Sequence, residues 1–200
     1  MEGKEKFTLG LELPSDPRWV NIAQLNIHDI LTDHAYCEQK AASSCISLIV
    51  LYADREKLVE VLAPIVAEEW SHFERVIAEL KKRGYSLGPQ RKDRYVEDLA
   101  KFIKKGGSRE QQLVEKLLMN ALIEARSCER FKILWKNIAD KELSEFYYAL
   151  MVSEAGHYKS FLKLAMEYMP EAAVLGRWRE WLTQEAEIIS NLDVRGDRIH

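Results

Sequence analysis

Glycine and proline are scarce in this sequence, with nine and five residues among 200. Few helix breakers, together with frequent Ala, Leu, Glu and Lys, favour long helices over a β-sandwich or barrel. The three cysteines, Cys37, Cys45 and Cys128, form no CxxC pair. No disulfide framework is therefore expected, and a reducing cytoplasm is the expected location. The longest apolar run, residues 45–53, is too short to span a bilayer, so no membrane partner is expected.

The remaining composition is that of an ordinary globular chain. Hydrophobic residues make up 47% and charged residues 30%, which excludes a disordered chain. A length of 200 residues suits one domain, and we expect residues 1–200 to form it. Residues 1–16 are polar, lack the apolar segment of a secretory signal, and are expected to lie on the surface. The net charge of −3 excludes a chain that binds nucleic acid over its whole surface.

Apolar residues recur at three- and four-residue spacing in four long stretches, the pattern of helices that bury one face. The first two expected helices run from about residue 17 to 52 and from an N-cap at Asp54 to Gly84, with a kink at Pro64. A third begins at a capping box formed by Ser108 and Gln111, and a fourth runs from an N-cap at Asp140 to just before Pro170. A further helix runs from Glu171 to Asn191. Residues 84–107 form a long connection with a short helix from about Asp93 to Lys104. The prediction is an all-α fold, a ferritin-like four-helix bundle with one long crossover and additional peripheral helices.

The second helix of each predicted hairpin carries one Glu-x-x-His motif. The two motifs are Glu69–His72 and Glu154–His157. Residues three apart share one helical face and can bind one metal ion together. A single motif of this kind is a weak signal, because a glutamate on a helix is usually a solvated surface residue. The first helix of each hairpin also carries a mid-helix glutamate, Glu38 or Glu124.

The two sets of residues are spaced almost identically. Glu38 precedes Glu69 by 31 residues and Glu124 precedes Glu154 by 30, so the halves are offset by 85 or 86 residues. One Glu from each of two helices and a Glu-x-x-His from each of the others is the ligand set of dinuclear carboxylate proteins. Glu38 and Glu124 also share helical faces with apolar residues, and a buried carboxylate needs a partner. The six predicted metal ligands are Glu38, Glu69, His72, Glu124, Glu154 and His157.

Several neighbouring residues are alternatives. Glu68 is four residues before His72 and competes with Glu69, but the equivalent position in the second half is Ser153, which favours Glu69. His34 lies one turn before Glu38 and either supports that ligand or makes an ordinary helix hydrogen bond, which we favour. We interpret the three cysteines as small core residues, and Tyr147, Tyr148 and Tyr158 as packing residues rather than radical sites. No catalytic residue beyond the metal ligands is expected.

The segments around these ligands resemble the ligand motifs of the MiaE-type tRNA hydroxylases. They read YCEQKAA at 36–42, EEWSHF at 68–73, EARSCE at 124–129 and SEAGHY at 153–158. The resemblance covers almost the whole chain. It implies a non-haem enzyme with two iron ions held by the six residues above and with O2 as co-substrate. The implied reaction is hydroxylation of the isopentenyl side chain of 2-methylthio-isopentenyladenosine in tRNA. No flavin, nicotinamide or rubredoxin-like motif is present, so an external electron donor or reductase is implied.

The connection between the hairpins is strongly basic. Residues 81–109 carry a formal charge of +7, which leaves −10 on the rest of the chain. Such an asymmetry is expected of a surface that binds phosphates, although lysines that only keep the segment soluble would give the same pattern. Tyr85 and Tyr95 in this segment could stack on bases. The predicted RNA-binding residues are Lys81, Lys82, Arg83, Arg91, Lys92, Arg94, Lys101, Lys104 and Lys105.

Other functions stay open at this stage. The ligand set also fits ferritin-like iron storage with a ferroxidase site, and it does not distinguish iron from manganese, so a manganese catalase or another two-metal oxidoreductase remains. A rubrerythrin-like peroxidase is less favoured, because the cysteine pairs of its second iron site are missing. A metal-free scaffold protein is the third class. A monomer or small homo-oligomer is expected of the enzyme, and a large hollow shell of a storage protein.

Overall fold

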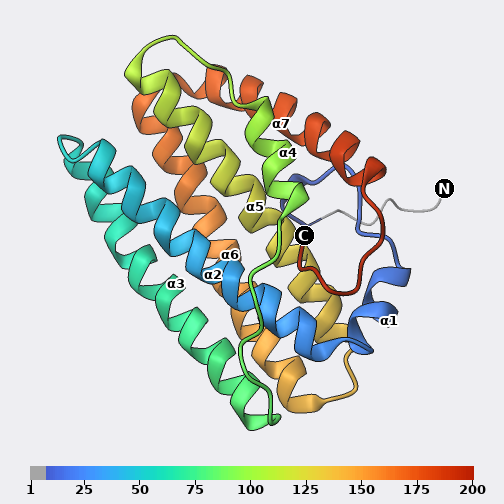
Figure 1. Ribbon diagram of the computed structural model, residues 1–200. Helices are drawn as coiled ribbons and strands as arrows, with labels where there is room; N and C mark the ends of the chain where they lie inside the picture. Colours follow the sequence, from blue (N-terminus) through green and yellow to red (C-terminus); the bar gives the residue numbers. More distant parts are fainter. Residues whose placement is uncertain (1–7) are drawn as a thin grey trace. The chain divides into compact units, whose positions relative to one another are not determined.

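Helices make up the regular structure of residues 8–200, the part of the chain that the computed structural model describes, and no β-strand occurs in that part (Figure 1). The all-α prediction is confirmed. In chain order the elements are η1 (Thr8–Gly10), α1 (Arg18–Gln24), α2 (Ile27–Leu51), α3 (Glu56–Lys82), α4 (Arg94–Phe102), α5 (Arg109–Asn137), α6 (Lys141–Tyr168) and α7 (Glu171–Asn191). None of the described helices has the length and apolar character needed to cross a membrane. The predicted surface position of residues 1–16 falls partly on residues 1–7, which lie outside the described residues.

The described chain forms two compact units, and each contains one hairpin of long helices. Residues 18–92 and 194–199 form one unit, in which α2 and α3 pack side by side (Figure 1). Residues 8–17, 93–193 and 200 belong to the other, in which α5 and α6 form the hairpin and α4 packs against α7 (Figure 1). The two predicted hairpins and the long connection are therefore present. That residues 1–200 form a single domain stays a prediction.

Side-chain caps begin three of the helices, α4, α5 and α6. The Ser108 hydroxyl accepts a hydrogen bond from the backbone N–H of Gln111, and the Gln111 side chain accepts one from the N–H of Ser108, which confirms the predicted capping box of α5. Asp140 caps α6 as predicted, by accepting from the backbone of its first turn. Asp93 caps α4 in the same way. These caps satisfy backbone N–H groups that the helices leave without partners.

The start of α3 differs from the prediction. Its N-cap is Arg55 rather than Asp54, and no side chain makes a capping hydrogen bond there. The backbone carbonyl of Arg55 accepts from Leu58 instead, so the tight turn itself begins the helix. The helix then continues unbroken through Pro64 to Lys82. Gly84 follows two residues later, and its φ of +74° lies in the left-handed region that glycine adopts without steric cost.

A buried arginine on α5 connects α4, α7 and the chain before α1 within one unit. Arg126 is 0% exposed, and its Nε donates to Glu185 on α7 at 2.7 Å. Its Nη1 donates to Glu129 at 3.1 Å, and the Ser15 hydroxyl donates to the same carboxylate. The Tyr95 hydroxyl of α4 donates to Glu185 at 3.2 Å. Arg126 thus supplies a cation to two buried carboxylates, which offsets the cost of burying them.

Replacing this arginine should therefore destabilise the fold strongly. Arg126→Ala leaves Glu185 and Glu129 buried without their cation, and we expect the free energy of unfolding to fall by about 3–5 kcal/mol in urea denaturation. Arg179→Ala, which removes an exposed arginine from α7, is the matched control and should change stability by less than about 0.5 kcal/mol. Equal effects of the two substitutions would show that the buried network does not stabilise this unit.

Candidate metal centre

The first acidic cluster lies between α2 and α3, inside one hairpin. Glu38 projects from α2, and Glu69 and His72 from α3, and each is at most 4% exposed. His72 Nδ1 lies 3.4 Å from Glu38 Oε2 and 3.7 Å from Glu69 Oε2. One ligand atom from each residue lies within 4.8 Å of the other two. Three donor atoms at this spacing can converge on a single metal ion.

A fourth buried residue fixes the orientation of Glu38. His34 is 0% exposed, and its Nε2 donates to Glu38 Oε1 at 2.6 Å. Of the two roles considered for His34, the structure shows the contact with Glu38 rather than the ordinary helix hydrogen bond that we favoured, and the i, i+4 spacing on α2 is the signal for it. One oxygen of Glu38 is thus held by His34, while the other faces His72. Residues that hold a ligand in this way raise metal affinity in other proteins.

The second acidic cluster has the same composition in the other hairpin. Glu124 projects from α5, and Glu154 and His157 from α6, and each is at most 5% exposed. His157 Nδ1 lies 3.2 Å from Glu154 Oε2. One ligand atom from each residue again lies within 4.8 Å of the other two. The structure therefore brings three of the six predicted ligands together in each unit, and we call each set of three a triad.

The donor chemistry of both triads fits a metal ion. Each triad has two carboxylates and one imidazole, a mixture that suits borderline divalent ions such as iron and manganese. Two carboxylates buried at this depth are costly unless a positive charge lies beside them. One divalent cation per triad would balance the two carboxylates, and the histidine would complete each ligand set. Buried clusters of this kind are compatible with a metal site.

The structure distinguishes the two glutamates that compete for His72. Glu69 is 1% exposed and lies beside the imidazole, whereas Glu68 is on the solvent side of α3. The preference for Glu69 over Glu68 follows from helix geometry, since adjacent residues point about 100° apart on a helix. Ser153, the counterpart of Glu68, is only half-buried. The ligand role itself stays a prediction for all six residues.

The two cysteines nearest the triads are core residues, as expected. Cys45 and Cys128 are 1% and 2% exposed, and all three cysteines are free thiols. Burial, with the negative charge of Glu69 added, raises the pKa of the Cys45 thiol to about 12. Burial and Glu154 raise the pKa of Cys128 to about 12 in the same way. Both thiols are therefore protonated at neutral pH and act as small neutral residues beside the carboxylates.

Two of the tyrosines near the motif on α6 pack against aromatic rings. Tyr147 is 0% exposed and its ring centroid lies 5.4 Å from that of Phe131. Tyr158 packs against Trp178 at 5.9 Å. Burial raises the pKa of the Tyr158 hydroxyl above its ordinary value, which keeps it neutral. The third tyrosine, Tyr148, also packs against a ring, that of Trp135 at 4.8 Å, so the geometry agrees with the packing role expected for all three.

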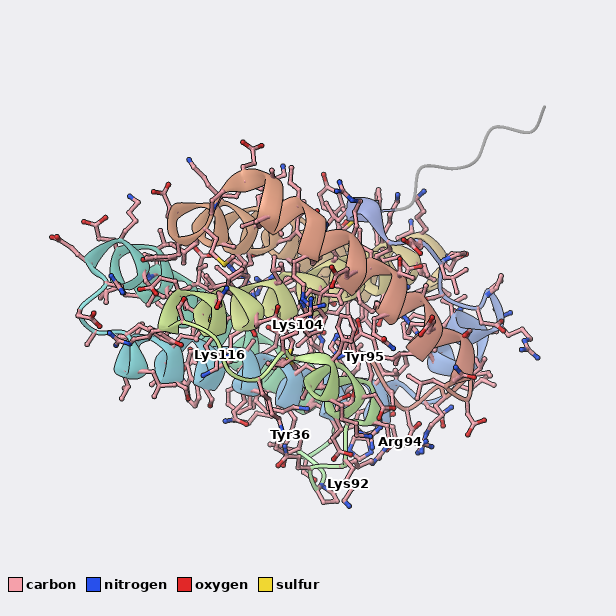
Figure 2. The ribbon with its side chains drawn as sticks, turned by 90° about the horizontal axis from the view of Figure 1, so that it is seen from above. Tyr36, Lys92, Arg94, Tyr95, Lys104 and Lys116 are labelled. Carbon is pink, nitrogen blue, oxygen red and sulfur yellow. The ribbon has the colours of Figure 1, made fainter. Side chains whose placement is uncertain are left out.

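The predicted RNA-binding residues divide into exposed and half-buried side chains. Lys81, Lys82, Lys92, Arg94, Lys101, Lys104 and Lys105 are exposed, and Arg83 and Arg91 are half-buried. Figure 2 shows Lys92 at the outer edge of the connection between the hairpins. The half-buried pair contacts carboxylates: Arg83 donates to Glu79, and Arg91 to Asp29 and, at 2.8 Å, to Asp197. The two arginines therefore offer less charge to a phosphate than the sequence suggests.

In the other unit, part of the basic charge is also paired. Lys104 donates to Glu180 at 2.9 Å and Lys101 to Asp98 at 2.5 Å, both at the surface (Lys104 is labelled in Figure 2). Tyr95 does not fit the stacking role considered for it, because it is 2% exposed and bonded to Glu185. Tyr95 lies with Leu99 on the buried face of α4, and its partner Glu185 is 90 positions away in the sequence.

Comparison with known proteins identifies relatives along almost the entire chain. The family described as tRNA-(MS[2]IO[6]A)-hydroxylase (MiaE) matches residues 4–200. A tRNA 2-(methylsulfanyl)-N(6)-isopentenyladenosine(37) hydroxylase of Pseudomonas putida is 37% identical over 183 residues, which cover 92% of this chain and 88% of the relative. The enzyme of the same name from Salmonella typhimurium is 27% identical, over 95% of this chain and 87% of the relative.

A solved structure is also similar over almost its full length. It is titled "Protein 43 with aldehyde deformylating oxygenase activity from Synechococcus" and is 34% identical, with a TM-score of 0.89 over 95% of this chain and 94% of that one. Together with the two hairpins and the long connection, this likeness confirms the predicted ferritin-like fold class. The match over residues 4–200 and the 37% identity to a curated relative lead to one conclusion: the chain belongs to the MiaE family of tRNA hydroxylases.

Proposed function

We propose that this chain is an oxygen-dependent di-iron monooxygenase that hydroxylates the isopentenyl side chain of 2-methylthio-isopentenyladenosine in tRNA. The family and the names of both curated relatives support the substrate. The observation that carries the chemistry is the pair of equivalent buried triads, each with two carboxylates and one histidine. Family membership also favours the hydroxylase over the iron-storage alternative that the ligand pattern left open.

We further propose that the two triads hold two iron ions in one dinuclear centre. Glu38, Glu69 and His72 would be the ligands from one hairpin, and Glu124, Glu154 and His157 those from the other. Four carboxylates against two divalent cations leave the centre without net charge, which supports burial at this depth. The observed His34–Glu38 hydrogen bond would fix the orientation of one ligand before any metal binds.

The reaction adds one oxygen atom to a C–H bond of the isopentenyl group and reduces the other to water. It consumes one O2, two electrons and two protons, and the electrons come from an external reductase. Bound iron would supply the activation of O2, which carboxylate and imidazole side chains alone do not perform. The protein contributes the arrangement of the ligands. The neutral Cys45 and Cys128 thiols add no competing charge and help keep the site dry.

A tRNA substrate also fits the cytoplasmic location and the monomer or small homo-oligomer that we propose. Cytoplasmic tRNA is accessible to a cytoplasmic enzyme, and no described helix could cross a membrane. A monomer or small oligomer would leave the exposed lysines of the connection open to the phosphate backbone. Lys92 and Arg94 would supply more of the electrostatic attraction than Arg83, Arg91, Lys101 and Lys104, because the last four pair with carboxylates.

A second candidate reaction follows from the solved neighbour. Its title names aldehyde deformylating oxygenase activity, and its 34% identity and TM-score of 0.89 place it close to this chain. An oxygenase that releases formate from an aliphatic aldehyde would use the same class of metal centre on a different substrate. The two candidates therefore share the predicted ligands and differ in the substrate and in the bond that is broken.

The metal content of purified protein tests the ligand assignment. Protein loaded with ferrous iron without chelators should hold close to two ions per chain, and Glu38→Ala or His157→Ala should lower that number because each removes a donor atom. His34→Ala should keep the donor set but weaken metal affinity by roughly 10- to 100-fold. The control is Glu68→Ala, which removes the exposed neighbour of Glu69. Full retention of both ions in the Glu38 and His157 variants would contradict the assignment.

Single-turnover oxygenation tests the reaction. Reduced, iron-loaded protein given isotopically labelled O2 should place one labelled oxygen atom in the isopentenyl group of tRNA. Glu124→Ala should abolish this by removing a proposed ligand, and Glu68→Ala should not. Formate release from an aliphatic aldehyde, with the tRNA unchanged, would instead favour the second candidate. Hydroxylation that survives complete metal removal would exclude both.

Salt dependence tests the contribution of the basic connection. Lys92 and Arg94 are exposed and make no ion pair with the described residues. If both contact phosphates, replacing them with Gln should flatten the slope of log affinity against log salt by about 1.4 to 1.8, since each contact contributes about 0.7 to 0.9. Adding Arg91→Gln should change the slope little further, because Asp29 and Asp197 already neutralise that arginine. A slope that does not respond to Lys92 and Arg94 would place the RNA-binding surface elsewhere.

A further inference from the structure

Two stacked rings, one of an exposed tyrosine and one of a half-buried histidine, lie where the connection leaves α3. The imidazole of His28, in the first turn of α2, stacks on the ring of Tyr85 with centroids 4.7 Å apart and planes 19° apart. Tyr85 is 40% exposed. Leu87, two residues further on, is 38% exposed. The metal chemistry uses none of these residues, and an open aromatic surface of this kind needs an explanation.

The stack is held in place from both sides. The backbone N–H of Tyr85 donates to the Leu80 carbonyl of α3 at 2.9 Å, which the left-handed Gly84 makes possible. His28 Nε2 donates to the carbonyl of Ser86 at 3.0 Å. Tyr85 is therefore attached to the end of α3 through its backbone and to α2 through its ring. A surface that is already ordered loses little conformational entropy when a ligand binds.

The rest of the connection is fixed along α2 in the same unit. The Tyr36 hydroxyl donates to the Gly88 carbonyl at 2.9 Å, and Figure 2 shows Tyr36 on α2 beside this segment. Gly88 approaches α2 so closely that an added Cβ would lie 3.3 Å from the Thr32 side chain. Arg91 is tied to Asp29, the neighbour of His28. These contacts make the segment that carries Tyr85 part of a rigid surface.

The lysines near the stack are exposed, whereas the nearby carboxylates are paired. Lys81 and Lys82 lie in the last turn of α3, just before Tyr85, and both are exposed. Lys92 is exposed at the other end of the segment. The nearby carboxylates of Glu79 and Asp29 are already paired with arginines. The aromatic surface is thus flanked by lysines, with the adjacent acidic groups neutralised.

We propose that the His28–Tyr85 stack is a binding site for a nucleobase in a single-stranded loop of the RNA substrate; this rests on the proposed function. Proteins recognise unpaired bases by stacking them on Tyr and His rings while Lys and Arg contact the phosphates. His28 lies ten residues before Glu38 on α2, roughly 15 Å along the helix axis. The base that stacks therefore belongs to a different nucleotide from the one that is oxidised.

Binding of an anticodon stem-loop RNA that carries the isopentenyl group tests this proposal. Tyr85→Ala should weaken binding roughly 5- to 150-fold, the range for loss of one base–aromatic stack. Tyr85→Phe keeps the ring and should stay within about twofold of the unmodified protein. Tyr148→Ala removes an equally exposed tyrosine from α6, at 46% exposure, and should have no effect. Tyr85→Leu keeps a large apolar side chain but removes the ring, and it replaces the alanine variant in the test if that variant does not fold.

Abasic substitution in the RNA gives an independent readout on the intact protein. One loop position should lose affinity for the unmodified protein when its base is removed, and that loss should disappear in the Tyr85→Leu variant. The stacking site would be overturned, and the tRNA substrate left in place, by two results together. The Tyr85→Ala and Tyr85→Leu variants would bind the RNA as tightly as the unmodified protein, and no loop position would show a loss of affinity that depends on Tyr85. Failure of the unmodified protein to bind the RNA at all would overturn the proposed function itself.

Discussion

The burial of carboxylate side chains is the constraint on which the rest of this structure depends. Glu38, Glu69, Glu124 and Glu154 are each at most 5% exposed, on helices that otherwise bury apolar stripes. Such charge in the interior is unfavourable unless cations or hydrogen bonds compensate for it. Both hairpins have the same arrangement, in which a glutamate on the first helix faces a Glu-x-x-His motif on the second. The near-identical spacing of the two halves is what this shared geometry requires.

A second set of buried charges is compensated differently. Glu185 and Glu129 pair with Arg126, so protein groups alone balance them. Desolvation lowers the pKa of Arg130, the next arginine on α5, to about 10, so it remains charged at neutral pH. The contrast matters for function, because the network around Arg126 holds its helices together without a metal. In the triads the carboxylates lie beside a histidine instead, His72 in one hairpin and His157 in the other.

The sequence predicts features that depend on neighbouring residues, but not contacts between residues that are far apart along the chain. Helix positions, the capping box at Ser108 and the N-cap at Asp140 follow from local patterns. The choice of Glu69 over Glu68 follows from the internal repeat and helix geometry. Contacts between residues far apart in sequence could not be read in this way. Arg91 meets Asp197 across 106 positions, and Tyr95 reaches Glu185 across 90, so neither arginine pairing nor tyrosine burial was evident.

The central claim is that the two triads together bind two iron ions as one centre. X-ray absorption at the iron edge of fully loaded protein tests it most directly, because the fine structure reports a neighbouring metal. The account predicts oxygen and nitrogen ligands only, with a second iron roughly 3.5–4 Å away. Two bound irons with no metal neighbour within that distance, or sulfur among the ligands, would contradict it.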